Sequence, residues 1–158
     1  MNLYGISGEI FLAISGMIAL LISVFSSKDS SLKITTRFCN LSLLISLILI
    51  ISSHQNSGYL FNGMYVYDGL SLYSKILILL GTILTLLIGS KPQKIDGFNQ
   101  PEYPVLVLFS VLGMVLMSSS KNLISLYMAL ELQSLPLYVI AAINRDNLKS
   151  SEAGLKYF

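Results

Sequence analysis

Residues 123–143 read LISLYMALELQSLPLYVIAAI, an apolar stretch with one carboxylate, Glu131, near its centre. A helix of about 20 residues crosses the roughly 30 Å hydrocarbon core of a bilayer, so this stretch is long enough to span a membrane. An acidic side chain at the centre of such a helix costs roughly 2.5–3.5 kcal/mol on insertion scales. Acids placed inside a membrane are functional by default, so Glu131 defines the first candidate site.

Four further apolar stretches precede it and have about the length of a membrane span. They cover residues 6–25, 38–53, 70–90 and 104–119. The second and fourth are short, and we expect them to extend into the flanking polar sequence. A sixth helix is predicted over 150–158, with Ser150 as its N-cap and Glu152 in its first turn. The sequence therefore predicts an all-α transmembrane bundle, a single membrane domain with five complete helices and the start of a sixth.

The composition supports a membrane class. The chain is 54% hydrophobic and only 11% charged, whereas about a quarter of the residues of a soluble domain are charged. A net charge of +2 without a basic cluster argues against nucleic-acid binding. The single cysteine, Cys39, lies in an apolar run and is expected to be buried and unreactive. No CxxC pair, GxGxxG turn or Walker-type loop is present, so we expect no nucleotide, flavin or iron–sulfur site.

Lysine and arginine predict the orientation, because cytoplasmic or matrix loops carry an excess of both. In the segments that connect the predicted helices, seven lysines and arginines lie on one side of the membrane. One, Lys121, lies on the other side. The seven are Lys28, Lys33, Arg37, Lys91, Lys94, Arg145 and Lys149. We therefore expect the N-terminus outside. Since no Lys or Arg precedes Lys28, we interpret the first stretch as a retained helix and not a cleaved signal.

The surroundings of Glu131 favour proton handling. At helical spacing Glu131 shares one face with Tyr127, Ser134 and Tyr138, which form a supporting polar stripe. Pro136 removes a backbone donor and is expected to bend or loosen the helix beside it. A carboxylate with hydroxyl neighbours can hold or release a proton, because desolvation favours its neutral form and a nearby cation its charged form. The alternative is a structural Glu131, protonated or hydrogen-bonded to a neighbouring helix.

Two lysines are candidate partners of Glu131. Lys75 lies near the outer end of the third stretch, where the simpler interpretation is a side chain that snorkels to the interface. Lys156 follows Glu152 by four residues, in the order that stabilises a helix. A helix-stabilising contact and a role in proton relay both stay open for this pair.

The remaining polar residues give weaker signals. Glu9 is predicted to be interfacial. His54 lies at a membrane boundary, and a single histidine without a second ligand is poor evidence for a metal site. Arg145 and Asp146 are most simply a solvated loop pair. A packing role is expected for Met114, Met117 and Met128.

A family resemblance rests on residues 122–158, which read NLISLYMALELQSLPLYVIAAINRDNLKSSEAGLKYF. This stretch resembles subunit 2, subunit N in bacteria, of the proton-pumping NADH:quinone oxidoreductase, respiratory complex I. Three upstream segments are similar too: GEIFLAISGM at 8–17, FNGMYVYDGLSLYSKIL at 61–77 and PEYPVLVLFSVLGMVLMSSSKNL at 101–123. The resemblance therefore covers nearly all of the chain.

The resemblance implies an antiporter-like membrane-arm subunit that couples NADH-to-quinone electron transfer to proton pumping. In this family the glutamate matched by Glu131 pairs with a lysine of a later, broken helix. Glu152 and Lys156 match positions close to the proton route, and Lys75 matches a lysine of the third helix. NAD, FMN, iron–sulfur clusters and quinone are bound by other subunits, so we expect no catalytic redox residue, cofactor or metal site here.

The chain departs from the family because the later broken helix and its lysine are absent. We therefore expect a fragment or a split-gene product, completed by a C-terminal continuation or a second chain and surrounded by other membrane-arm subunits and lipid. A cation/proton antiporter subunit is the alternative function, and a purely structural membrane fragment is the third. The expected location is the mitochondrial inner membrane or the bacterial plasma membrane.

Overall fold

The structure, a computed structural model, describes residues 3–25, 28–53, 58–89, 100–144 and 147–158. Within these ranges it contains six α-helices and one two-stranded antiparallel hairpin. The helices are α1 (Ser7–Phe25), α2 (Lys28–Ser53), α3 (Gly69–Gly89), α4 (Glu102–Met117), α5 (Leu123–Ala141) and α6 (Leu148–Tyr157), and the strands are β1 (Gly58–Leu60) and β2 (Tyr65–Tyr67).

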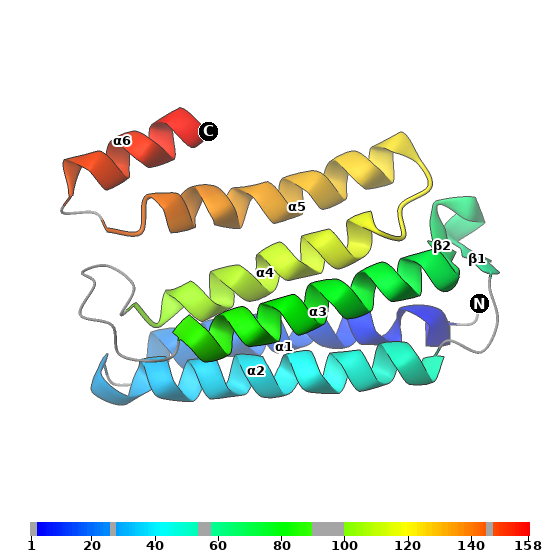
Figure 1. Cartoon of the computed structure of the whole chain (residues 1–158), viewed down its shortest axis with the longest axis horizontal. Helices are drawn as coiled ribbons and strands as arrows, with labels where there is room; N and C mark the ends of the chain where they lie inside the picture. Colours follow the sequence, from blue (N-terminus) through cyan, green and yellow to red (C-terminus); the bar gives the residue numbers. More distant parts are fainter. Residues whose placement is uncertain (1–2, 26–27, 54–57, 90–99, 145–146) are drawn as a thin grey trace.

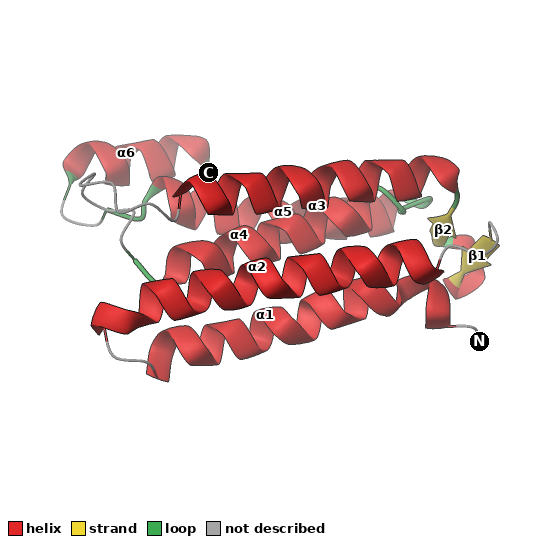
Figure 2. Cartoon of the chain, turned by 60° about the horizontal axis from the view of Figure 1, so that its bottom comes forward, coloured by secondary structure: helices red, strands yellow, loops and turns green. Residues whose placement is uncertain are grey.

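Helices α1 to α5 run alternately up and down along one common direction (Figure 1). The C-terminal ends of α1, α3 and α5 lie at one end of the bundle, and the hairpin lies at the other (Figures 1 and 2). Four segments are long and apolar enough to cross a membrane: α1, residues 32–53 of α2, α3 and α5. The predicted fold class, a polytopic helical membrane protein, is confirmed.

Helix α4 is the central element of the bundle. It contacts α1, α2, α3 and α5. With 16 residues it is about 24 Å long, shorter than a typical span. It buries Val105, Leu108, Val111 and Val115, which pack with leucines of the surrounding helices in one apolar core. The outer faces of the neighbouring helices expose large apolar side chains, such as Met17 and Ile88, as expected for contact with lipid.

Two helix starts differ from the sequence prediction. Helix α2 begins at Lys28, well before the predicted residue 38. Within this added stretch the Thr36 hydroxyl donates to the Leu32 carbonyl at 2.7 Å, so this polar side chain is satisfied inside its own helix. Helix α6 begins at Leu148, and its N-cap is Asn147, whose side chain accepts from the Lys149 backbone nitrogen at 3.0 Å. The prediction of Ser150 as N-cap is wrong, and Ser150 donates to the Ala141 carbonyl instead.

The hairpin between α2 and α3 was not predicted. Its turn uses left-handed backbone at Phe61, Asn62 and Gly63, with φ of 52°, 54° and 85°. Strand β2 is tied to the link between α4 and α5, because the Val66 nitrogen donates to the Ser119 carbonyl at 2.8 Å and the Lys121 nitrogen donates to the Met64 carbonyl at 3.0 Å. The hairpin therefore holds Tyr65 at a fixed place against the end of the bundle.

Helices α4 and α5 approach closely at Gly113. A Cβ atom there would lie 2.5 Å from the Gln133 backbone nitrogen and 2.8 Å from the Ala129 carbonyl oxygen. We expect Gly113→Ala to destabilise the fold by about 1–3 kcal/mol, because backbone cannot move aside as a flexible side chain does. Thermal unfolding in detergent micelles, followed by circular dichroism, measures the loss. The matched control is Gly81→Ala, because a Cβ there meets nothing within 4 Å; equal melting of the two variants would contradict the prediction.

Candidate functional site

A charged cluster, which we call the outer cluster, joins Glu9, Tyr65 and Lys75. Lys75 Nζ donates to Glu9 Oε1 at 2.6 Å and to the Tyr65 hydroxyl oxygen at 2.7 Å. The Tyr65 hydroxyl donates to the same Glu9 oxygen at 2.6 Å. The side chains of Glu9 and Lys75 are each only 3% exposed. Three groups thus form a closed hydrogen-bonded ring inside the protein.

Three separate elements position the outer cluster. Glu9 lies in the first turn of α1, on the buried face that continues through Leu12. Lys75 lies on the buried face of α3, one turn after Ser71 and one turn before Leu79. Tyr65 comes from β2, which the contacts described above fix to the bundle. The interpretation of Lys75 as a side chain that snorkels to the interface is therefore wrong, and Glu9 is buried inside the protein.

The Tyr65 phenol acts as a donor to the carboxylate. Burial, the negative charge of Glu9 and the hydrogen bond to Glu9 all raise the pKa of Tyr65. The phenol therefore keeps its proton at physiological pH and donates it in the hydrogen bond to Glu9 Oε1. Lys75 Nζ also lies 4.9 Å from the centre of the Tyr65 ring, which adds a cation–π contact.

Part of the outer cluster was detectable from the sequence. Ser71, Lys75 and Leu79 follow one another at four-residue spacing, so the neighbours of Lys75 indicate a helix face turned to the interior. Glu9 shares a face with Leu12 in the same way. Tyr65 could not be found, because it reaches Glu9 through a hairpin contact across 56 residues of sequence.

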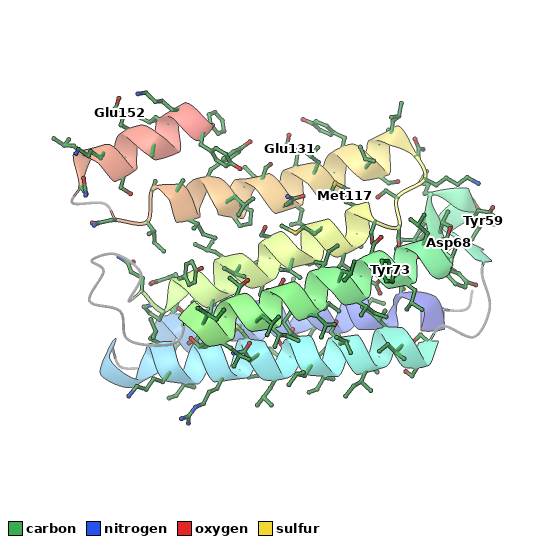
Figure 3. The ribbon with its side chains drawn as sticks, viewed as in Figure 1. Tyr59, Asp68, Tyr73, Met117, Glu131 and Glu152 are labelled. Atoms are coloured by element: carbon green, nitrogen blue, oxygen red, sulfur yellow. The ribbon has the colours of Figure 1, made fainter. Side chains whose placement is uncertain are left out.

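Glu131 lies on a different face of the bundle. Ala129 and Gln133 of α5 face Gly113 of α4, and each is two residues, roughly 200° of helical rotation, from Glu131. Figure 3 shows Glu131 on the side of α5 away from α4. Its side chain is half-buried. Across the described ranges, no Lys or Arg forms an ion pair with it.

The predicted polar stripe along α5 is only partly continuous. Tyr127 lies one helical turn before Glu131, and its side chain is exposed. Ser134 Oγ donates to the Glu131 backbone carbonyl at 3.3 Å, not to its carboxylate. Tyr138 packs edge-on against Tyr157 and Phe158 of the α6 segment. Helix α5 itself continues through the buried Pro136 without a break.

Glu152 and Lys156 form an ion pair at 2.7 Å on α6. Their side chains are 63% and 75% exposed, and Figure 3 shows Glu152 on the side of α6 away from α5. In this arrangement the pair stabilises its own helix by a few tenths of a kcal/mol, about 0.2–0.5. The structure does not bring either residue to Glu131.

His54, Lys91, Lys94, Arg145 and Asp146 lie outside the described residues. Cys39 is buried, as predicted. Met114 and Met117 are half-buried, but Met128 is 65% exposed, so the packing role expected for Met128 is wrong within this chain. Among the described residues, no group of three His, Cys, Asp or Glu side chains could hold a metal ion.

Comparisons with known proteins agree on one family. Residues 120–158 match the family model described as NADH:quinone oxidoreductase/Mrp antiporter, transmembrane. The chain is 47% identical to NADH-quinone oxidoreductase subunit N of Bartonella bacilliformis over 153 residues, which cover 95% of this chain and 30% of that protein. It is 48% identical to subunit N of Pelagibacter ubique over 158 residues, which cover 99% of this chain and 33% of that protein.

A solved structure shows the same fold. One chain of the respiratory complex I from Thermus thermophilus with bound aureothin matches with a TM-score of 0.74 and 28% identity. The match covers 96% of this chain and 32% of that chain. The present chain thus spans about a third of the length of the relatives that it matches.

Fold and comparisons together define a class, the membrane-embedded antiporter-like proteins, to which this chain is similar along nearly its whole length. More narrowly, the chain is similar to subunit N of NADH-quinone oxidoreductase. The resemblance stated from residues 122–158 is confirmed.

The outer cluster makes a prediction for stability. Lys75→Met leaves the Glu9 carboxylate buried without its cation, so we expect a loss of about 3–5 kcal/mol in the free energy of unfolding. The double variant Glu9→Gln/Lys75→Met removes both charges and should recover most of that loss. Thermal unfolding in detergent micelles measures both. Lys156→Met, on the exposed pair, is the control and should change stability by no more than about 0.5 kcal/mol. A Lys75→Met variant as stable as this control would contradict the prediction.

Proposed function

We propose that this chain forms part of a membrane-arm, antiporter-like subunit of NADH:quinone oxidoreductase, in which NADH-to-quinone electron transfer is coupled to proton translocation. The observation that carries the proposal is the 47% identity to a subunit N over 95% of the chain. The apolar helices and the buried ion pair between them support it, because charged groups inside a membrane bundle mark ion or proton pathways.

In this proposal Glu131 holds and releases the proton. Its side chain is half-buried on the side of α5 that faces away from α4, one helical turn after the exposed phenol of Tyr127. A cation approaching that face would favour the carboxylate and expel the proton, and its withdrawal would favour the neutral acid. The cation would be a lysine of a later helix, supplied by a C-terminal continuation or a second chain.

The same proposal gives Lys156, Glu152 and Lys75 supporting roles. Lys156 belongs to a helix that packs on α5 through Tyr138, so a modest rotation of α6 would change the distance of its ammonium from α5. Before such a rotation, the ion pair with Glu152 holds the Lys156 ammonium in place. Ser134 and Tyr138 complete the polar stripe. Lys75 acts at the other end of the bundle, in the outer cluster.

The chain would contribute proton handling and no redox chemistry. NAD, FMN, iron–sulfur clusters and quinone would be bound by other subunits of the complex. The partners would be other membrane-arm subunits and the lipid bilayer, in the bacterial plasma membrane or the mitochondrial inner membrane. The exposed apolar side chains of α5, Leu130 and Leu135 among them, are suited to contact further helices.

A cation/proton antiporter subunit is the second candidate, because the matched family model covers both classes. The relatives named above are subunits of NADH-quinone oxidoreductase, which favours the first candidate. Neighbouring genes discriminate the two: other subunits of the oxidoreductase favour the first, and antiporter subunits favour the second.

Glu131→Gln tests the proposed function. In the assembled complex, reconstituted in proteoliposomes, we expect proton ejection and coupled quinone reduction to fall by about tenfold or more, because glutamine keeps the shape but carries no exchangeable acid proton. The matched control is Glu102→Gln, which neutralises an exposed carboxylate in the first turn of α4. If both variants pump as the unchanged complex does, Glu131 has no role in the proton route.

A further inference from the structure

The outer cluster has a feature that a purely structural ion pair does not need. Both donors, Lys75 Nζ and the Tyr65 hydroxyl, bond to one oxygen of Glu9, its Oε1. The second oxygen, Oε2, is buried and accepts no hydrogen bond from a described residue. A carboxylate oxygen removed from water in this way requires a hydrogen-bond donor, which a water molecule or a bound proton would supply.

A small cavity with polar walls lies beside this carboxylate. Its volume is about 20 Å³, enough for one water molecule, since a water needs roughly 10–15 Å³ measured in this way. Glu9 and Lys75 line it together with the hydroxyl residues Ser53, Tyr67 and Ser71. A water molecule needs two to four polar partners, and these walls supply them.

The surroundings contain few other titratable groups. The hairpin contributes Tyr65 and Tyr67, and α3 contributes Lys75. From α2, the described residues lining the cavity are Ile50 and Ser53, neither of which titrates near neutral pH. Asp68 points its carboxylate at the Ser71 backbone nitrogen, at 2.8 Å, and so caps α3. Glu9 Oε2 is therefore the buried carboxylate oxygen without a hydrogen bond among the described residues of this neighbourhood.

We propose that Glu9, Tyr65 and Lys75, with one water molecule in the adjoining cavity, form a second proton-binding site that is separate from Glu131. A proton arriving through the water forms an O–H bond with Glu9 Oε2, and release breaks that same bond. Lys75 and Tyr65 keep their protons throughout, so the net charge of the cluster changes from zero to one positive charge and back. This inference rests on the proposed function, and adds a site at the end of the bundle that the lysine and arginine distribution predicts to face outside.

The deciding variant is the double substitution Glu9→Gln/Lys75→Met in the complete complex. It removes both charges at once, so no buried charge is left unpaired and the complex should assemble. Proton ejection per NADH oxidised, measured in proteoliposomes, should be lost in part or in full, while a structural pair would leave it unchanged. The matched control is Glu102→Gln/Lys33→Met, which neutralises one exposed carboxylate and one exposed lysine.

The outcomes separate this inference from the proposed function. Reduced proton ejection in the double variant, with a normal control, supports the second site. Normal ejection in the double variant together with impaired Glu131→Gln overturns the second site and leaves the proposed function standing. Normal ejection in both overturns both.

A second measurement does not depend on assembly of the neutralised variant. Infrared difference spectra of the unchanged complex between two pH values should contain a carboxylic-acid carbonyl band from Glu9. Glu9→Asp keeps a carboxylate opposite Lys75, and it should shift that band because the two acids absorb at different frequencies. Spectra identical in the unchanged complex and in Glu9→Asp would show that Glu9 takes up no proton and would overturn the inference.

Discussion

The ion pair between Glu9 and Lys75 is the constraint around which the N-terminal half of the bundle is built. It joins α1 to α3 across 66 residues of sequence and draws the hairpin in through Tyr65. Two ions in a low-dielectric interior cost several kcal/mol each to desolvate, and only close, well-directed contacts offset that cost. The three residues must therefore stay at their present separations, and that requirement fixes how the ends of the two helices and the hairpin meet.

Some hydroxyls elsewhere in the bundle are satisfied within their own helix. Hydroxyls on the helices donate to carbonyls of the preceding turn, as Ser15 does to Leu12 and Thr82 does to Ile78. Such bonds satisfy the hydroxyl donor within its own helix and allow small polar residues between helices. Close contact is made at α4, where Gly113 lets the α5 backbone approach without an intervening side chain. The tight centre and the apolar outer faces together suit a bundle that lies in a membrane.

The sequence predicted the helices well because hydrophobic length is a local property. It placed Glu131 near the centre of its helix, and α5 runs from Leu123 to Ala141. The sequence-based prediction failed where contacts between residues far apart in the chain determine the environment of a side chain. Lys75 was interpreted from its position along one helix, although the partner that makes it an interior residue lies on α1. The N-cap of α6 was misplaced because Asn147 and Ser150 are about equally good caps, and only the contact of Ser150 with Ala141 separates them.

The tie between the hairpin and the α4–α5 link has a mechanical consequence. Val66 and Met64 flank Tyr65, and both are bonded to backbone on the link, at Ser119 and Lys121. Lys121 lies two residues before α5, the helix that carries Glu131. A displacement of this link would therefore move the backbone on both sides of Tyr65. The strand that carries Tyr65 and the link that leads into α5 therefore share one set of backbone hydrogen bonds.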